Sequence, residues 1–376
     1  MHSRSPGSGS VAENAGAPTA RQEAGRRGDQ AGGTLADSTV SETGATACAA
    51  DRSRAGAAPV RHVTGLLRQD GAMRRPPLSW LALLLPLAAA CGAGPGAAPP
   101  SGSAGPAVTA AALSARPCGT TTVPPVWRHV VWIIEENRSY NQIVGSPAAP
   151  YLARLARECG LATDYAGVAH PSLPNYLALT SGSTHGVVDD AGPSAHPVAG
   201  PSIFSLLGSR WRTLAESMPL ACDRQPSGNY AVKHNPAVYY TSIRAACARQ
   251  DVPLGRTPDL AAAFTVIVPN LCNDMHDCST ATGDVWMSRE LPLIFSSAAY
   301  RAGDTAAFIT WDESDAGGSQ VPLYVIAPSV RPGTRVHEAL SHYSLLRTTE
   351  EMLGLHPLLG AARRAPSMAQ AFGLER

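Results

Sequence analysis

The chain has 376 residues, of which 44% are hydrophobic, 16% charged and 6% aromatic, and its 30 basic side chains nearly balance 29 acidic ones. This balance excludes a protein that works mainly by coating nucleic acid or an anionic membrane. The length allows one large or two ordinary domains, but 35 Gly and 32 Pro are too many for a uniformly packed core.

Residues 1–72 contain no large aromatic side chain. The first aromatic residue is Trp80, and all the others lie between Trp127 and Phe372. Residues 1–72 are rich in Gly, Ala, Ser, Thr and Arg without helical or strand periodicity, so burial cannot offset the entropy of ordering them. We expect a leader that is disordered or not translated.

Residues 73–91 read MRRPPLSWLALLLPLAAAC, with two arginines, an apolar run and small residues before Cys91. This is the layout of a secretory signal, and the apolar run of about 11 residues is shorter than the roughly 20 needed to span a bilayer. We expect translation to begin at Met73. The segment also resembles a lipoprotein processing site with Ala88 in place of the usual Leu, so both secretion and a lipid anchor on Cys91 remain open.

Residues 92–117 are mostly Gly, Ala, Pro and Ser, the composition of a flexible tether, and residues 118–376 are the candidate catalytic domain. Six cysteines follow the signal, which predicts three disulfides with 15 possible pairings. Proximity in the chain favours Cys272 with Cys278 and Cys222 with Cys247, which leaves Cys118 for Cys159. A zinc site is less favoured because no CxxC spacing occurs.

Four runs of the domain are apolar on both faces and rich in β-branched residues, as strands buried between helix layers are. They are His129–Ile134, Ala263–Val268, Ala306–Thr310 and Pro322–Ala327. Helical stretches are expected at Pro150–Glu158, Leu173–Thr180, Ile203–Glu216, Val285–Ser297 and Ser344–Leu353. The alternation predicts an α/β fold, a three-layer sandwich with a central, mostly parallel β-sheet.

Polar residues follow three of these strands, at the edge where the loops of an open α/β sheet converge on a ligand. The clusters are Glu135–Asn137, Asn270–Asp277 and Asp312–Asp315. A fourth segment, His170–Tyr176, begins a predicted helix and places Ser172 at its start. We therefore expect carboxylates, carboxamides, histidines and one serine at a single rim.

A serine at a helix start suits nucleophilic attack on phosphorus, because the helix dipole and free backbone amides stabilise a nearby anion. A divalent cation touching the Ser172 oxygen would lower its pKa and activate it. Glu136, Asn137, Asp312 and Glu313 are hard oxygen donors suited to such an ion. On residues alone, an ordinary N-cap role for Ser172 stays open.

Six blocks spread over Trp127–Leu355 point to one family. They are HVVWIIEENRSY, HPSLPNYLALTSG, YAVKHNPAVYY, VPNLCNDMHDCS, ITWDESD and LSHYSLLRTTEEMLGL. Together they resemble the bacterial phosphoesterase family, which includes acid phosphatases and phosphatidylcholine-type phospholipases C. The resemblance implies an alkaline-phosphatase-like fold with a metal-activated serine at the start of a helix beside the central sheet.

The resemblance also implies roles for individual residues. Ser172 would be the nucleophile, and one divalent metal ion would be bound by Ser172, Glu136, Asn137, Asp312 and Glu313. Asn175 would bind a phosphoryl oxygen. The remaining pocket residues, which would contact phosphate or protonate the leaving group, would be His170, His234, Asp274, His276 and His342.

The residue types also bear on how many metal ions bind and on which element they are. Asn270 stands where related pyrophosphatases have an aspartate, so we expect one ion; the nearby histidines, if protonated, would neutralise phosphate charge in place of a second. Carboxylate and carboxamide ligands suit Mg, Mn or Ca, and the histidines also admit Zn or Fe.

These assignments imply an exported, metal-dependent acid phosphatase that hydrolyses phosphate monoesters through a phosphoserine on Ser172. A phospholipase C acting on phosphodiesters is the first alternative, although residues 118–376 leave no room for that group's extra C-terminal domains. An inactive cell-surface binding lipoprotein is the second, against which the presence of all five metal-site residues argues. We expect a monomer, a phosphate-ester or phospholipid substrate, no nucleic-acid partner, and membrane contact only through a lipid on Cys91.

Overall fold

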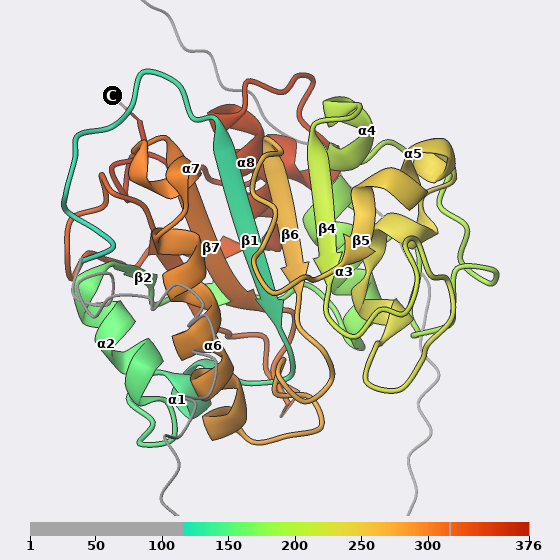
Figure 1. Ribbon diagram of the computed structural model, residues 1–376, viewed down its shortest axis with the longest axis horizontal. Helices are drawn as coiled ribbons and strands as arrows, with labels where there is room; N and C mark the ends of the chain where they lie inside the picture. Colours follow the sequence, from blue (N-terminus) through green and yellow to red (C-terminus); the bar gives the residue numbers. More distant parts are fainter. Residues whose placement is uncertain (1–115, 316, 376) are drawn as a thin grey trace, which may run out of the picture. The chain divides into compact units, whose positions relative to one another are not determined.

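The computed structural model describes residues 116–315 and 317–375 (Figure 1). The expected leader, the signal with Cys91 and nearly all of the tether lie outside these residues. Among the helices described, none is long and apolar enough to cross a membrane.

An eight-stranded sheet forms the centre of the domain, in the order β5-β4-β6-β1-β7-β8-β2-β9 (Figure 1). Its strands are β1 His129–Glu135, β2 Gly160–Ala162, β4 Trp211–Ala215, β5 Asp251–Pro253, β6 Phe264–Val268, β7 Thr305–Trp311, β8 Leu323–Ile326 and β9 Arg335–Val336. Neighbouring strands are parallel except at β8, which runs antiparallel to both β7 and β2. Two short strands, β3 Tyr165–Ala166 and β10 Leu340–Ser341, pair separately.

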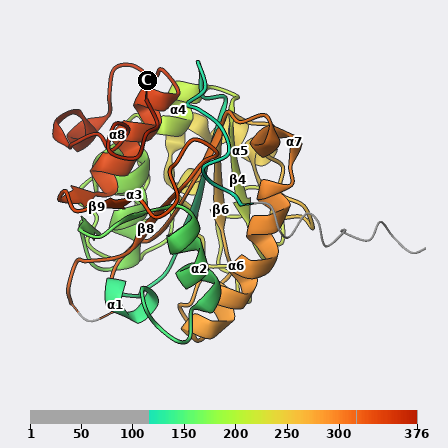
Figure 2. The same cartoon turned by 90° about the vertical axis from the view of Figure 1, so that its left-hand side faces the viewer.

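Helices cover both faces of this sheet. The α-helices are α1 Tyr140–Ile143, α2 Pro150–Glu158, α3 Ser172–Ser181, α4 Ile203–Leu207, α5 Arg244–Gln250, α6 Thr280–Phe295, α7 Ala298–Arg301 and α8 His342–Met352. Figure 2 shows α3, α4 and α8 on one face and α2, α6 and α7 on the other. The predicted three-layer α/β sandwich with a mostly parallel sheet is therefore confirmed.

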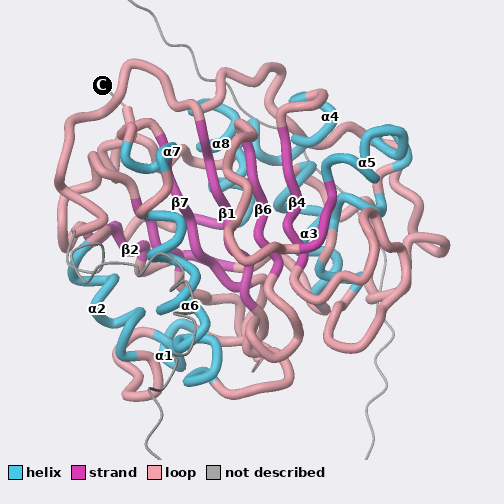
Figure 3. Tube along the Cα trace, viewed as in Figure 1, coloured by secondary structure: helices cyan, strands magenta, loops and turns pink. Residues whose placement is uncertain are grey.

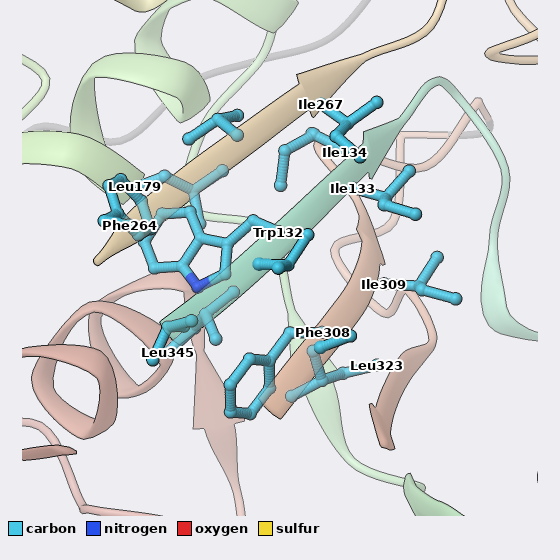
Figure 4. Packing of buried hydrophobic residues seen from close by; sticks show 14 of the residues in the cluster. Trp132, Ile133, Ile134, Leu179, Phe264, Ile267, Phe308, Ile309, Leu323 and Leu345 are labelled. Atoms are coloured by element: carbon cyan, nitrogen blue, oxygen red, sulfur yellow. The ribbon is translucent and has the colours of Figure 1, made fainter. Parts of the chain in front are cut away.

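Strand β1 is buried on both sides, as its uninterrupted apolar sequence predicts. Trp132 packs edge to face on Phe264 of β6, with ring centroids 4.7 Å apart, and its indole N–H donates to Thr349 of α8 at 3.0 Å (Figure 4). Side chains alternate along a strand, so Glu136, four residues after Trp132, continues the face that α3 and α8 cover. The neighbouring Glu135 falls on the opposite face.

The helix expected over Ile203–Glu216 is wrong. Helix α4 ends at Leu207, because Gly208 has φ 63° and ψ −103°, a conformation that favours glycine and does not continue a helix. The chain then enters β4, which pairs with β5 and β6. Over this short stretch the apolar spacing of β4 also fits the second half of an amphipathic helix, which is why the sequence predicts helix there.

The three disulfides that chain proximity favoured are all present. Cys118 bonds Cys159, Cys222 bonds Cys247, and Cys272 bonds Cys278. The last of these closes the loop after β6, one of the loops that meet at the carboxyl ends of the strands (Figure 3).

Candidate active site

Ser172 is the first residue of α3, and it lies at the carboxyl edge of the central strands. Every residue of α3 is buried, so the helix start is fixed against the sheet. The Ser172 hydroxyl donates to Glu136 Oε2 at 3.0 Å and lies 3.4 Å from Glu313 Oε1. A buried serine hydroxyl thus contacts two carboxylates from two different strand ends.

The two strand ends are brought together because β1 and β7 are neighbours in the sheet. Glu136 and Asn137 follow β1, while Asp312 and Glu313 follow β7. The Asn137 backbone N–H donates to Asp312 Oδ1 at 3.3 Å, and Asn137 has φ 51°, a left-handed conformation that asparagine tolerates.

These carboxyl groups are held in a dry environment that disfavours their charge. Burial raises the pKa of Glu136 well above its ordinary value, and the neighbouring Asp312 and Asp274 raise it further. Burial likewise raises the pKa of Asp312 to about 8, with Glu313 adding to the effect. Burial raises the pKa of Glu313 as well. A cation at this position would relieve their mutual repulsion.

His234 lies on the other side of Glu136. It ends the short 3-10 helix Val232–His234 and stacks on the Tyr176 ring, with centroids 5.4 Å apart. Its Nε2 is 3.2 Å from Glu136 Oε1, and its Nδ1 is 3.2 Å from Asp274 Oδ2. Burial lowers the pKa of His234 well below its ordinary value, and Lys233 and His276 lower it further, which disfavours the protonated form that neutralisation of phosphate by this residue would need.

His276 completes this second group from the disulfide-closed loop after β6. Its Nδ1 is 2.7 Å from Asp277 Oδ1, and its ring lies 5.6 Å from that of His234. Ligand atoms of Glu136, His234 and His276 lie within 4.8 Å of one another. Oxygen donors therefore lie on one side of Glu136, and imidazoles lie on the other.

Comparison with known proteins identifies the family. Residues 145–356 match the sequence profile of the Phosphoesterase family. The chain is also 34% identical over 256 residues to the phosphatidylinositol-3-phosphatase of Mycobacterium tuberculosis, an alignment that covers 66% of this chain and 84% of that protein. The chain belongs to the Phosphoesterase family. It is accordingly a phosphoric ester hydrolase.

More distant relatives of this phosphoesterase are fungal. It is 28% identical over 235 residues to the phosphate-repressible acid phosphatase of Penicillium chrysogenum. This alignment covers 56% of this chain and 55% of the fungal protein. The chain thus spans about half the length of that enzyme. A solved structure of an alkaline phosphatase superfamily protein from Vibrio parahaemolyticus aligns with a TM-score of 0.47 and 12% identity, over 68% of this chain and 73% of that one.

The donor set of the phosphoesterase fits a divalent metal ion. Asp312 Oδ2 is buried and accepts no hydrogen bond, and the buried Glu313 Oε2 and Asp274 Oδ2 have only the imidazoles of His170 and His234 beside them. Leaving a buried carboxylate oxygen unpartnered is costly, and hard oxygen donors are the ligands that Mg, Mn and Ca prefer. The cluster of Cys222, Cys247 and Asp251 does not offer a comparable site, because its cysteines form a disulfide.

Two predicted pocket residues, Asn175 and His342, differ in role from the expectation. Both amide hydrogens of Asn175 go to backbone carbonyls, of Ala169 at 2.8 Å and Pro171 at 3.4 Å, which leaves no donor for a phosphoryl oxygen. His342 is fully buried, with Nε2 2.6 Å from the Asp312 backbone oxygen and Nδ1 2.9 Å from the Tyr165 hydroxyl. Asn175 and His342 therefore brace the site's backbone instead of lining the pocket.

His170, also a predicted pocket residue, lies at the rim. Its Nδ1 is 2.5 Å from Glu313 Oε2 and its side chain is 45% exposed. A cavity of about 330 Å³ opens beside it, lined by His170, Glu313 and residues 167–169 and 317–319. Asn270, by contrast, bonds within its own loop and to Ser217, away from the carboxylate cluster.

Sequence reasoning missed two side chains of the site. Tyr176 donates to Glu136 Oε1 at 2.6 Å, and its position four residues after Ser172 on one helix was the signal that the two share a face. Asp190 lies in the irregular segment between α3 and α4 and accepts from the Leu173 backbone N–H at 2.9 Å. Nothing in its local sequence indicated this contact.

Proposed function

We propose that the chain hydrolyses phosphate monoesters through attack of Ser172 on phosphorus. The observation that carries this proposal is the Ser172 hydroxyl, buried at the start of α3 and within hydrogen-bond distance of Glu136 and Glu313. The phosphatase names of the mycobacterial and Penicillium relatives support a monoester over a phospholipase-type diester substrate.

In the proposed reaction the Ser172 oxygen forms a bond to phosphorus as the bond to the alcohol oxygen breaks. The hydroxyl proton passes to Glu136 or Glu313, which already face that oxygen. Rim residue His170, beside Glu313 and the cavity, would return a proton to the departing alcohol once its Nε2, 3.1 Å from the Gly318 carbonyl oxygen, turns to the substrate. Water then hydrolyses the phosphoserine and regenerates the hydroxyl.

The residues proposed to hold one divalent metal ion are Ser172, Glu136, Asn137, Asp312 and Glu313. When bound, the ion would lower the pKa of the serine hydroxyl and neutralise charge that develops on the phosphoryl group. Tyr176 would keep Glu136 oriented through its 2.6 Å hydrogen bond, and the Asn137 backbone would do the same for Asp312.

Replacement of the serine tests the proposal. We expect Ser172→Ala to lower kcat for p-nitrophenyl phosphate by at least about a thousandfold, because the covalent route is lost. Ser181→Ala, which removes a hydroxyl from the other end of α3, is the matched control and should retain near-normal activity. Mass spectrometry of acid-quenched enzyme should detect phosphate on Ser172 during turnover.

The same assay tests the metal and the substrate class. Chelation should abolish activity, and re-addition of Mg, Mn, Ca, Zn or Fe should identify the ion. Parallel assays with phosphatidylinositol 3-phosphate and phosphatidylcholine should show release of inorganic phosphate from the first and no cleavage of the second. Full activity of Ser172→Ala, or of the stripped enzyme, would contradict the assignment.

We also propose that the enzyme works outside the cytoplasm, as a secreted or lipid-anchored protein. Its three disulfides support an oxidising compartment. Recovery of the protein from the cytoplasm with free thiols would count against this location.

A further inference from the structure

Asp190 accepts a hydrogen bond from a backbone N–H group at the start of α3, the helix that begins at Ser172. Its Oδ1 accepts from the Leu173 backbone N–H at 2.9 Å, and its Oδ2 accepts from Lys233 Nζ at 2.8 Å. Leu173 directly follows Ser172, within the first turn of α3, where backbone N–H groups have no partner inside the helix. The backbone N–H group next to the proposed nucleophile is therefore hydrogen-bonded to a carboxylate.

That amide is one that a phosphoryl oxygen would otherwise use. Free N–H groups at a helix start bind phosphate because the donors converge and the helix dipole favours negative charge. At Leu173, a carboxylate oxygen of Asp190 already accepts the hydrogen bond that this N–H would donate to phosphate. A phosphoryl group that used the Leu173 N–H would have to share it with Asp190 or displace Asp190 from it.

The same carboxylate also cancels a positive charge at the site. Lys233 lies 3.5 Å from His276 Nε2, so it is adjacent to the imidazole side of the site as well as to α3. Its pairing with Asp190 leaves it little net attraction for a substrate anion. The Asp190 charge also reaches the reacting carboxylates, since it adds to the effect of burial in raising the pKa of Glu313.

We propose that Asp190 is a specificity-determining residue that makes the site select phosphate esters carrying a single negative charge. A monoester loses its second proton with a pKa of roughly 6 and is then a dianion, whereas a diester stays a monoanion. A fixed carboxylate repels the dianion more strongly, and a paired Lys233 does not compensate. The inference rests on the proposed role of Ser172 and specifies which charge form of a monoester its site accepts.

The test compares two substrates at one pH above 6. For wild type and Asp190→Asn, kcat/KM is measured with p-nitrophenyl phosphate and with bis(p-nitrophenyl) phosphate. The asparagine keeps an acceptor for Leu173 but removes the charge, so we expect the monoester-to-diester ratio to rise by about tenfold, well within the reach of one charge at close range. Inhibition by orthophosphate should strengthen in parallel.

The neighbouring residue provides a matched control. Asp189 is exposed and pairs with His196 at 2.5 Å, so Asp189→Asn removes the same charge without touching Leu173 or Lys233. Its substrate ratio should stay at the wild-type value. Adding Lys233→Gln to Asp190→Asn should reverse the gain, because the released ammonium is what attracts the dianion.

Each failure is distinguishable. An unchanged ratio in folded Asp190→Asn, with Ser172→Ala inactive, overturns the selectivity role and leaves the nucleophile assignment intact. Full activity of Ser172→Ala overturns the proposed function itself. If thermal unfolding shows that Asp190→Asn does not fold, Asp190→Ser supplies the same readout with a hydroxyl acceptor at the helix start.

Discussion

At the scale of single residues, Asp312 is positioned by its backbone carbonyl as well as by its carboxylate. The carbonyl contacts His342 Nε2, and a Cβ on Gly167 would lie only 2.7 Å from the same oxygen. We therefore expect Gly167→Ala to displace Asp312 and lower kcat/KM by roughly tenfold to a hundredfold, because small misplacements of reacting groups are costly. Steady-state kinetics checks this, with Gly192→Ala as control, since a Cβ there meets no atom within 4 Å. Equal effects of the two variants would contradict it.

At the scale of elements, two disulfides should separate stability from activity. Chain-entropy arguments assign about 4 kcal/mol to the Cys118–Cys159 bond, which spans 41 residues, and about 2 kcal/mol to Cys272–Cys278, which spans 6. The second bond closes the loop that carries Asp274 and His276. Replacing Cys118 and Cys159 by serines should therefore lower the free energy of unfolding more. Replacing Cys272 and Cys278 by serines should lower kcat/KM more. Denaturant unfolding and kinetics of both variants measure this, and unimpaired activity in Cys272→Ser/Cys278→Ser would exclude the loop's role.

Elements also show what the sequence could and could not predict. Strands β1, β6 and β7 were recognisable because both faces are buried and their runs are apolar throughout, and the polar residues after β1 and β7 do converge. Strand β4 was mistaken for helix because its apolar spacing fits either period over a short stretch. Asp190 and the bracing roles of Asn175 and His342 depend on contacts across the fold, which local pattern does not encode.

At the scale of the whole molecule, buried carboxyl groups should make the fold sensitive to pH. Burial raises the pKa of Asp251 to about 7, although Asn235 donates to it, and Glu290 and Glu350 are each raised to about 7 by burial. The folded state then holds protons that the unfolded chain has released between roughly pH 4 and pH 7, so the free energy of unfolding should fall as pH rises through that window.

Melting temperatures of the chelated protein at intervals from pH 4 to pH 7 measure this trend. Asp251→Asn should show a shallower fall. Asp259→Asn should not, because hydrogen bonds lower the pKa of Asp259, so its folded state holds no extra proton that unfolding would release. A slope that is identical in wild type and Asp251→Asn would rule out Asp251 as a contributor.

The position of β1 in the sheet bears on how the chain matures. Its neighbours β6 and β7 lie far along the chain, with Glu135 paired to Trp311. At a synthesis rate of about 5–20 residues per second, the segment that forms β7 emerges about 9 to 35 seconds after β1. Until the segment of β6 emerges, about 7 to 27 seconds after β1 at the same rate, the run HVVWII has neither partner strand, and such a segment is prone to intermolecular pairing. The central strand that aligns the carboxylates is thus also a part of the nascent chain that needs protection from aggregation.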